Sequence, residues 1–329
     1  MSWLLSTGLA WLRALEGDSG FAEAVADGVA VRNQPPSGVT QARLGYCWSH
    51  LALLFPEENN FARAAEKSFQ LLQDDFFSPD ESEFRIYDHS FYLLFMVWYS
   101  RLTGDPAAMR FFRNRHALIK QHYDDAGIGG FGPTMPGIRS HNPYMHLLEA
   151  MLSAFRHTQG DFWLAKAIAI KDLFFARLLD PTLPVIFEFR HPDWSVADGG
   201  RIEIGHQLEW PTLLLELHEI TGAQELSATA GRLLEFAKQH GFETGLAINA
   251  VRADGSAVDR AKLLWVQTEA ARRGLVSLDL IRQKFFHPNG WSWHNRLTAE
   301  GAPVEEPANA RLLYHVLTAA APSLSEPRR

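Results

Sequence analysis

Residues 142–155 read NPYMHLLEAMLSAF, and this stretch decides the fold because variants of it recur along the chain. A few polar or ring-bearing residues open it, and a dense apolar helical segment follows. The other five copies begin at QARLGYCWSHLALLF (Gln41), YDHSFYLLFMVWYS (Tyr87), GHQLEWPTLLLELH (Gly205), KLLWVQTEAARRG (Lys262) and NARLLYHVLTAAA (Asn309). Six copies in the chain leave about 55 residues for each, which is the length of two helices with their turns. The pattern predicts six helical hairpins.

The segments between the copies have the apolar spacing of helices with one buried face. They begin at Phe61, Asp161 and Gln224, and the segment from Trp3 to Leu15 is of the same kind. The copies themselves are apolar on nearly all sides, as expected of helices enclosed by others. This alternation predicts an all-α fold, an (α/α)6 barrel of six inner and about six outer helices. A superhelical solenoid of helical pairs is the alternative.

Length and composition narrow the classes of protein that fit. The 329 residues suit one or two domains, and the barrel pattern favours a single catalytic domain over residues 1–329. A net charge of −7 argues against a nucleic-acid partner, because phosphate binding needs clustered Lys and Arg. The single Cys47 cannot form an internal disulfide and favours a reducing compartment. With no basic leader and no long apolar run, we expect a cytoplasmic protein that does not contact a membrane.

Polar residues recur near the starts of the inner segments. His89, His146 and His206 are 57 and 60 residues apart, and Gln267 follows after 61 more. For any one histidine alone, a hydrogen-bonded role in the core is the more common explanation. Equivalent positions of a closed barrel converge on one end of its axis, however, so the shared phase predicts a common pocket.

Two copies contain His-x-x-Glu pairs, His146 with Glu149 and His206 with Glu209. Residues three apart share a helix face, so each carboxylate can orient its imidazole or reach the same ligand. The spacing also occurs in carboxylate-bridged di-iron sites, with Glu269 as a further donor. The other helices offer histidine, glutamine and aromatic residues in place of the glutamates that such a site needs. We therefore expect no metal and no cofactor.

The pattern suits a polyhydroxylated ligand better, because carbohydrate sites combine aromatic platforms with planar polar side chains. Aromatic residues of the same segments are Tyr46, Trp48, Tyr87, Trp210, Trp265 and Tyr314. The glycine-rich stretch from Gly127 to Gly132 lacks the following Lys-Ser/Thr of a phosphate-binding loop. It predicts a flexible loop at the mouth of the pocket, and residues 181–205 predict a short β-hairpin.

These motifs resemble the N-acylglucosamine 2-epimerase superfamily, which includes sugar 2-epimerases, mannose isomerases and related aldose–ketose isomerases. The matching stretches are Gln41-Ala-Arg43, Tyr87-Asp-His-Ser-Phe91, Asn142-Pro-Tyr-Met-His-Leu-Leu-Glu-Ala150, Gly205-His-Gln-Leu-Glu-Trp210, Leu264-Trp-Val-Gln-Thr-Glu269 and Leu313-Tyr-His315. Their order and spacing over residues 41 to 320 make the signal specific. The resemblance implies an (α/α)6 barrel and a metal-independent reaction at C2 of a reducing sugar.

The resemblance also implies roles for individual residues. His206 and His315 would be the catalytic pair that moves the proton, and His146 would contact the sugar and assist ring opening. The side chains that would hold the hydroxyls or the enediolate are Arg43, Glu209, Trp265 and Gln267, with Glu149 and Glu269 as supports. His294, one motif upstream, is the rival of His315 for the second catalytic role.

The chemistry explains why two imidazoles are needed. Ring opening brings a proton to the ring oxygen while another leaves O1. A base then removes the C2 proton, and a nearby cation stabilises the cis-enediolate that forms. Returning the proton to C1 gives a ketose, whereas returning it to C2 from the opposite face gives the epimer. Val316-Leu317-Thr318 follows His315, where epimerase branches have an arginine three residues on, so the end of the chain resembles the mannose isomerase branch.

We therefore expect an aldose–ketose isomerase for a free monosaccharide such as mannose or fructose. The alternative at the same site is a 2-epimerase of the mannose/glucose or N-acylglucosamine/N-acylmannosamine type. A glycoside hydrolase on the same barrel would depend on paired carboxylates, with Asp88 as its first candidate, and a catalytically silent binding protein is a third hypothesis. The expected partners are the sugar and a second copy of the chain in a homodimer.

Overall fold

The computed structural model describes residues 2–33, 35–74, 86–123 and 137–321, and these ranges contain twelve α-helices. The inner helices are α2 (Gly38–Leu54), α4 (Ile86–Thr103), α6 (Asn142–Thr158), α8 (Ile204–Thr221), α10 (Leu264–Arg272) and α12 (Leu312–Ala320). The outer helices are α1 (Ser2–Leu15), α3 (Asn59–Asp74), α5 (Pro106–Tyr123), α7 (Asp161–Leu173), α9 (Gln224–His240) and α11 (Leu278–Phe285). The glycine-rich stretch 127–132 lies outside the described residues.

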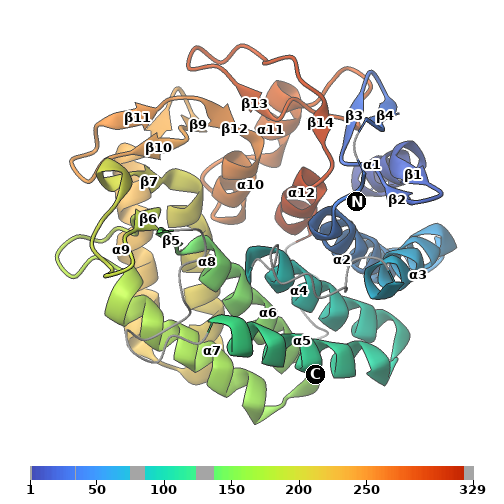
Figure 1. Cartoon of the computed structure of the whole chain (residues 1–329). Helices are drawn as coiled ribbons and strands as arrows, with labels where there is room; N and C mark the ends of the chain where they lie inside the picture. Colours follow the sequence, from blue (N-terminus) through green and yellow to red (C-terminus); the bar gives the residue numbers. More distant parts are fainter. Residues whose placement is uncertain (1, 34, 75–85, 124–136, 322–329) are drawn as a thin grey trace.

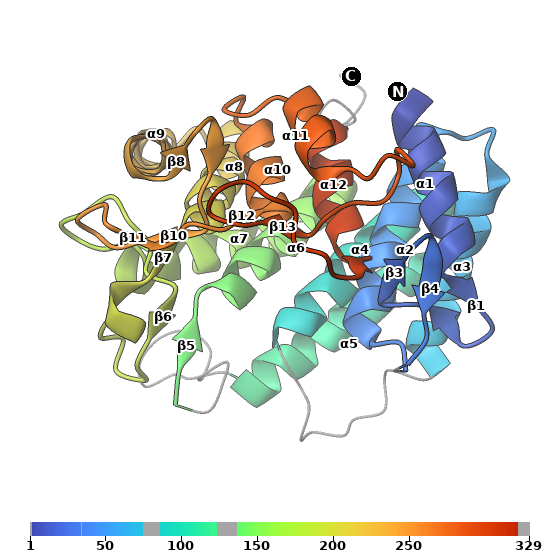
Figure 2. The same ribbon diagram turned by 90° about the horizontal axis from the view of Figure 1, so that it is seen from above.

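The inner helices form a closed ring. Each contacts the next one, and α12 packs against α2, as Figures 1 and 2 both show. The outer helices lie around this ring. Each of α3, α5, α7, α9 and α11 packs on the inner helix before it, and α1 packs on β3 and β4. Closure excludes the solenoid and confirms the predicted (α/α)6 barrel, including the outer helix expected over Trp3 to Leu15.

Burial differs between the two layers in the way the sequence indicates. In α2 every residue from Gly38 to Ala52 is buried. Outer helix α3 buries one face only, through Phe61, Ala64, Ala65, Phe69 and Leu72, which follow the 3–4 residue spacing of an amphipathic helix. Each fully buried leucine or phenylalanine side chain contributes roughly 1.5–3 kcal/mol. No helix in the described ranges is long and apolar enough to cross a lipid bilayer.

The connections at the two ends of the ring differ. From inner to outer helix the chain turns within a few residues, for example at Gly222, whose φ of 74° ends α8 in the left-handed region that favours glycine. From outer to inner helix the connections are long and carry all the described strands. These are β1 (Glu16–Gly17), β2 (Gly20–Phe21), β3 (Ala24–Ala26), β4 (Val29–Val31), β5 (Arg139–Ser140), β6 (Phe189–Arg190), β7 (Ile202–Glu203), β8 (Phe242–Glu243), β9 (Leu246–Ala247), β10 (Ala250–Val251), β11 (Ala257–Asp259), β12 (Lys262–Leu263), β13 (Arg296–Leu297) and β14 (Ala308–Asn309). The irregular structure therefore gathers at the N-terminal ends of the inner helices.

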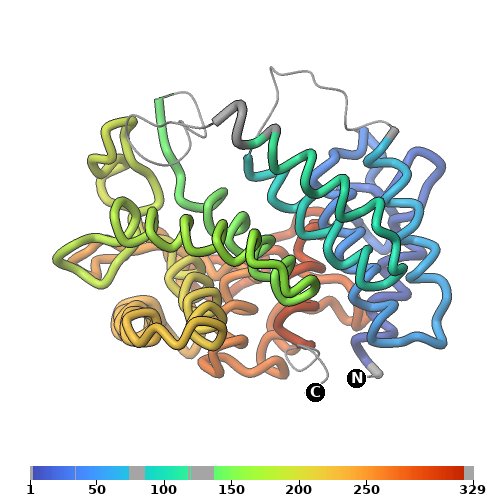
Figure 3. The backbone as a smooth tube through the Cα atoms, turned by 90° about the horizontal axis from the view of Figure 1, so that it is seen from below, coloured from blue at the N-terminus to red at the C-terminus, as the bar shows by residue number. Residues whose placement is uncertain are grey.

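Short antiparallel sheets fasten these connections to one another. Strand β14 pairs with β3, with Ala308 opposite Val25, so the last connection is bonded to the first where the two ends of the colour scale meet in Figure 3. In the stretch predicted as a hairpin, a bridge joins Arg190 to Val196. Its strands also pair outside the stretch, β6 with β5 and β7 with β10.

Glutamine side chains fix three of the connections to the inner helices. The amide of Gln41 exchanges two hydrogen bonds with the backbone of Phe21, at 2.8 and 2.9 Å. Gln267 does the same with Ala247, at 2.8 Å in both directions. On α8, Gln207 donates to the carbonyl of Ile186 at 3.2 Å. Each amide replaces a strand neighbour for backbone groups that burial would otherwise leave unpaired.

Candidate active site

Besides His89 on α4, whose ring lies 5.0 Å from that of Tyr92, three histidines and an arginine lie within the first two turns of the inner helices. They are His146 on α6, His206 on α8, His315 on α12 and Arg43 on α2, and each is 3–5% exposed. Trp265, in the first turn of α10, contacts two of the rings, with centroids 5.0 Å from His206 and 5.7 Å from His315. Helices far apart in the sequence thus bring two imidazoles to one indole.

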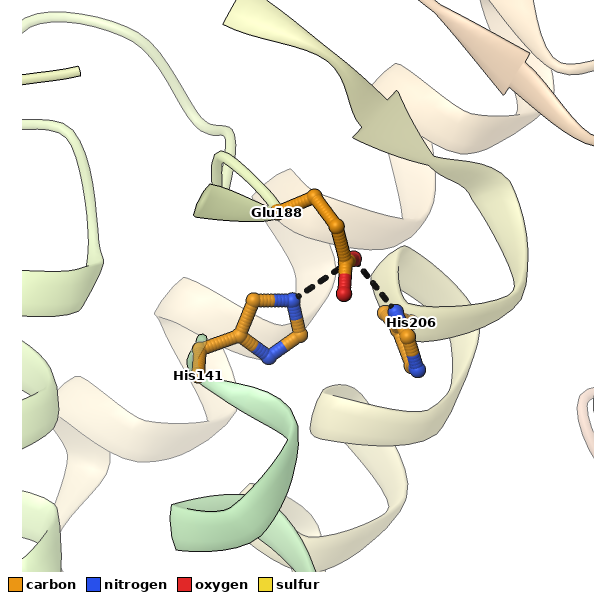
Figure 4. Close-up of side chains that lie close together, drawn as sticks. All are labelled: His141, Glu188 and His206. Atoms are coloured by element: carbon orange, nitrogen blue, oxygen red, sulfur yellow. Dashed lines mark hydrogen bonds and ion pairs between the residues drawn. The ribbon is translucent and has the colours of Figure 1, made fainter. Parts of the chain in front are cut away.

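A buried glutamate links two histidines at this end of the ring (Figure 4). Nδ1 of His206 lies 2.7 Å and Nε2 of His141 lies 3.1 Å from the same oxygen of Glu188. The indole N–H of Trp210 donates to Nδ1 of His141 at 3.1 Å. Since that nitrogen accepts, Nε2 of His141 carries the hydrogen and donates to Glu188. Glu188 therefore accepts a hydrogen bond from each ring.

These three side chains also form a cluster of a kind that binds metal ions, with ligand atoms within 4.8 Å of one another. A metal on Nε2 of His141 would require that nitrogen to lose its hydrogen while Nδ1 still accepts from Trp210. A neutral imidazole has only one nitrogen lone pair available for such a bond. The donor set therefore suits a hydrogen-bonded relay better than a metal.

The relay holds a positive charge on His206. Burial acts to lower the pKa of His206, but the carboxylates of Glu188, Glu203 and Glu209 outweigh it and raise this pKa to about 9. The Glu188 carboxyl is held ionised, because both imidazoles lower its pKa despite burial. At neutral pH His206 is an imidazolium whose Nδ1–H binds Glu188, and its Nε2–H is available as an acid.

His315 also binds a glutamate but has the opposite charge state. Its Nδ1 lies 2.9 Å from Glu269, whose second oxygen accepts from Arg272 at 2.8 Å. Burial lowers the pKa of His315, and the bond to Glu269 only partly opposes this. Arg272 neutralises Glu269, whereas no arginine ion pair to Glu188 is recorded among the described residues. His315 is therefore a neutral base with its Nε2 lone pair free.

His146 is the third imidazole at this end. Its Nδ1 lies 3.2 Å from Glu149, which also accepts a hydrogen bond from the Tyr314 hydroxyl. Burial lowers the pKa of His146 to about 4, so the ring is neutral at physiological pH. Glu209 approaches Nδ1 of His146 to 4.0 Å. Burial and the carboxylates of Glu269 and Glu149 keep the pKa of Glu209 well above its ordinary value.

Arg43 supplies a buried positive charge. Its guanidinium donates to the hydroxyl of Tyr87 at 2.7 Å and lies 3.9 Å from the ring centre of Phe91. No carboxylate is recorded within ion-pair distance of Arg43 in the described part of the chain. A cation held by a hydroxyl and aromatic faces retains its charge for an anionic ligand or intermediate.

Two of the residues expected at the site lie in other environments. Gln267 was expected to hold a hydroxyl or the enediolate, but it is fully buried and its amide N–H groups bind the carbonyls of Ala247 and Leu263. It therefore has no free N–H for a sugar. The rings of His294 and His287 lie with their centroids 3.9 Å apart and their planes tilted by 52°, and no contact between His294 and the Trp265 pair is recorded in the described residues. The geometry thus favours His315 as the second catalytic histidine.

We expect Gln267→Leu to lower stability far more than turnover. Leucine leaves the amide and carbonyl of Ala247 buried and unpaired, at about 1–3 kcal/mol for each group. Thermal unfolding followed by circular dichroism should show a clear drop in Tm, with kcat of the folded variant at 25 °C close to that of the parent. A large loss of kcat at an unchanged Tm would instead show that Gln267 contacts the sugar.

Gly205, which precedes His206, is required by the tight packing of Trp265. A Cβ at this position would collide with the six-membered ring of that indole. We expect Gly205→Ala to displace the indole and to lower kcat/KM by about 10–100-fold, because small misplacements in a site are costly. Gly231→Ala on α9 is the matched control, since open space surrounds its added Cβ. Equal kcat/KM for both variants would contradict this role of the indole.

The main residues that sequence reasoning missed are Glu188, His141 and Arg272. The first two come from long connections and the third from the end of α10. A signal for Glu188 was present, since it is the one acidic residue in the apolar run PVIFEF. The regular spacing of Glu149, Glu209 and Glu269, sixty residues apart, also marked three equivalent positions that converge on the axis.

Comparisons with known proteins identify the family. Residues 20–280 match the family model described as N-acylglucosamine 2-epimerase. Mannose-6-phosphate isomerase of Rhizobium meliloti is 28% identical over 269 residues, which cover 73% of this chain and 69% of the relative. D-mannose isomerase of Thermobifida fusca is 26% identical over 60% of this chain and 54% of the relative, so the match spans about half of that protein. A crystal structure of D-mannose isomerase has a TM-score of 0.87 at 18% identity, covering 97% of this chain and 95% of the other. The family match extends over most of the ring, and the chain belongs to the N-acylglucosamine 2-epimerase family.

Proposed function

We propose that the protein is an aldose–ketose isomerase that interconverts a free monosaccharide such as mannose with its ketose, fructose. The observation that carries this proposal is the pair of imidazoles at Trp265 with opposite charge states. Isomerisation through a cis-enediolate needs a neutral base at carbon and an acid at oxygen in the same site. His315 and His206 supply these two states at neutral pH.

In the proposed mechanism the neutral His146 assists ring opening by accepting a sugar hydroxyl proton at Nε2. Nε2 of His315 then removes the C2 proton of the open aldose, while the Nε2–H of His206 hydrogen-bonds to O1. The charge of Arg43 stabilises the enediolate that forms. His206 gives its Nε2 proton to O1 and takes up the proton of O2, and His315 returns its proton to C1, which leaves the carbonyl at C2.

Epimerisation is the alternative outcome at the same site. It requires a proton to reach C2 from the face opposite to the base, and His206 is the group that would deliver it. Incubation with mannose deuterated at C2 separates the two outcomes. Isomerisation by one base transfers part of the deuterium to C1 of fructose, whereas epimerisation by two groups gives glucose with solvent hydrogen at C2. Absence of both products, with N-acylglucosamine and N-acylmannosamine also unchanged, would refute the proposal.

The choice of a free sugar is supported by the charges around the site. No cluster of Lys and Arg is recorded around the three imidazoles in the described ranges, whereas a phosphate ester is usually held by several such groups. Mannose and mannose 6-phosphate should be compared at equal concentration, and a higher kcat/KM for the phosphorylated sugar would overturn this choice.

The proposal includes one catalytic domain, a cytoplasmic location and a homodimer. The unbroken ring from α1 to α12 supports the single domain, and the buried free thiol of Cys47 suits a reducing compartment. Sedimentation equilibrium tests the dimer, and a monomer across micromolar concentrations would contradict it.

A further inference from the structure

A cavity of about 340 Å³ lies at the other end of the ring from the three histidines. Side chains from all six inner helices line it, each from the middle or the C-terminal part of its helix. The roles described above for the reaction use the first turns of these helices. The cavity therefore lies behind the site at Trp265 and adjoins it at Glu149, which lines the cavity and also binds His146 and Tyr314.

The lining of this cavity is rich in arginine. Arg101, Arg156, Arg272 and Arg273 all contribute to it. Arg156 forms ion pairs with two glutamates of α8, and Arg272 pairs with Glu269. The guanidinium of Arg101 lies 4.6 Å from the ring centre of Trp98. No carboxylate within ion-pair distance of Arg101 is recorded in the part of the chain that the structure describes.

His50 gives the second sign that a ligand belongs there. Its side chain lines the cavity and is 4% exposed, and its Nε2 has no hydrogen-bond partner. Its Nδ1 lies 3.2 Å from the hydroxyl of Tyr46. Burial and the carboxylate of Glu149 keep the pKa of Tyr46 well above its ordinary value, and no other acceptor for this hydroxyl is recorded in the described residues. The hydroxyl therefore donates to Nδ1, which leaves Nε2–H of His50 as a donor without an acceptor.

We propose that this cavity, the rear site, is a second ligand site that binds a phosphate group through the Nε2–H of His50 and the guanidinium of Arg101. Arginine guanidinium groups match phosphate oxygens in geometry and charge, and the imidazole N–H gains the acceptor it lacks. The C-terminal ends of the inner helices carry partial negative charge, and Glu149, Glu216 and Glu219 also line the cavity. Arg156 and Arg272 are paired with glutamates, so Arg101 and Arg273 are the lining arginines with no recorded ion pair to a described carboxylate.

The rear site is connected to His315. Arg272 lines the cavity and neutralises Glu269, and Glu269 binds Nδ1 of His315. A phosphate beside Arg272 adds negative charge and weakens this neutralisation, so the pKa of His315 rises. This regulatory consequence rests on the proposed function, in which neutral His315 is the base. Phosphate binding therefore shifts the acid limb of the activity profile to higher pH.

Binding is tested without activity, by calorimetric titration of the whole protein with inorganic phosphate at constant ionic strength. We expect saturable binding of one phosphate, weakened about tenfold in Arg101→Gln because a charge-assisted hydrogen bond is lost. His50→Phe should weaken it as well, and Arg252→Gln, at an exposed position, should leave it unchanged. No saturable binding, or equal weakening by Arg252→Gln, overturns the proposal. If the parent protein binds no phosphate and Arg101→Gln lowers Tm, the arginines serve only to offset the negative charge at the C-terminal ends of the helices.

The coupling is tested by pH profiles of mannose turnover with and without saturating phosphate. An upward shift of the acid limb that Arg101→Gln abolishes supports it. Phosphate binding with an unmoved profile overturns the coupling but leaves the rear site. Phosphate binding by a protein that converts none of the sugars overturns only the proposed function.

Discussion

Replacing His315 by asparagine is expected to lower kcat for mannose–fructose interconversion by about 10²–10⁴-fold, the usual contribution of a positioned general base. Asparagine can still donate a hydrogen bond to Glu269, so the buried carboxylate keeps a partner and the fold is retained. What is lost is the Nε2 lone pair that removes the C2 proton. Ketose formation from mannose measures the effect, and exchange of the C2 deuteron with solvent should fall in parallel.

His294→Asn is the matched control for this experiment. The same substitution at the rival histidine changes a ring that packs against His287, and we expect turnover within about twofold of the parent, as for most substitutions away from a site. The reverse result, with full activity in His315→Asn and a large loss in His294→Asn, would move the base to the other histidine and overturn the proposed mechanism.

The second large effect is expected from Glu188→Gln. A glutamine keeps the shape but removes the charge that raises the pKa of His206 to about 9. With an unperturbed pKa near 6.5, only about 3% of His206 would be protonated at pH 8, and burial lowers the value further. Because the imidazolium is the acid, activity is lost as pH rises through this pKa. We expect about 30-fold lower kcat at pH 8, with the basic limb moved to lower pH.

Stability provides an independent check on Glu188. The folded pKa of His206 exceeds its unfolded value, so its contribution to stability is complete below pH 6.5 and is lost as pH rises through about 9. The parent Tm should therefore fall between pH 7 and pH 10, and this dependence should shrink in Glu188→Gln. The control is Glu305→Gln, whose side chain is 81% exposed, and it should keep the parent profile. An unchanged basic limb in Glu188→Gln would show that Glu188 does not set the charge of His206.

The barrel was predictable because its determinants are local and repeated. An apolar run such as residues 91–98 indicates within a few residues that the segment is a helix, that it is buried and that it belongs to the repeat. The histidine pair was predictable only through the family motifs, since no spacing rule links His206 to His315. The glutamine at position 267 was expected at the site because its position in the repeat resembles that of His206. In the structure it satisfies the backbone of Ala247, a partner twenty residues away that periodicity does not reveal.

The connections were the least predictable part of the molecule. Two-residue strands such as β5 and β6 leave no alternating pattern, because a partner distant in sequence determines where they form. Glu188 illustrates the consequence, since it enters the site from such a connection and its two imidazoles lie 47 and 18 residues away. The different charge states of His206, a cation, and His315, which is neutral, likewise depend on Arg272, which neutralises one glutamate and not the other.

The pairing of β14 with β3, which joins the last connection of the ring to the first, determines when the enzyme becomes active during its synthesis. A nascent chain that has left the ribosome as far as α10 already contains the acid and Trp265, but it lacks α12 with the base and has not closed its ring. Contacts that join the two ends of a sequence form slowly, because a long loop must close first. Activity therefore arises in one late step after translation has passed α12, and a prematurely terminated product has no partial turnover.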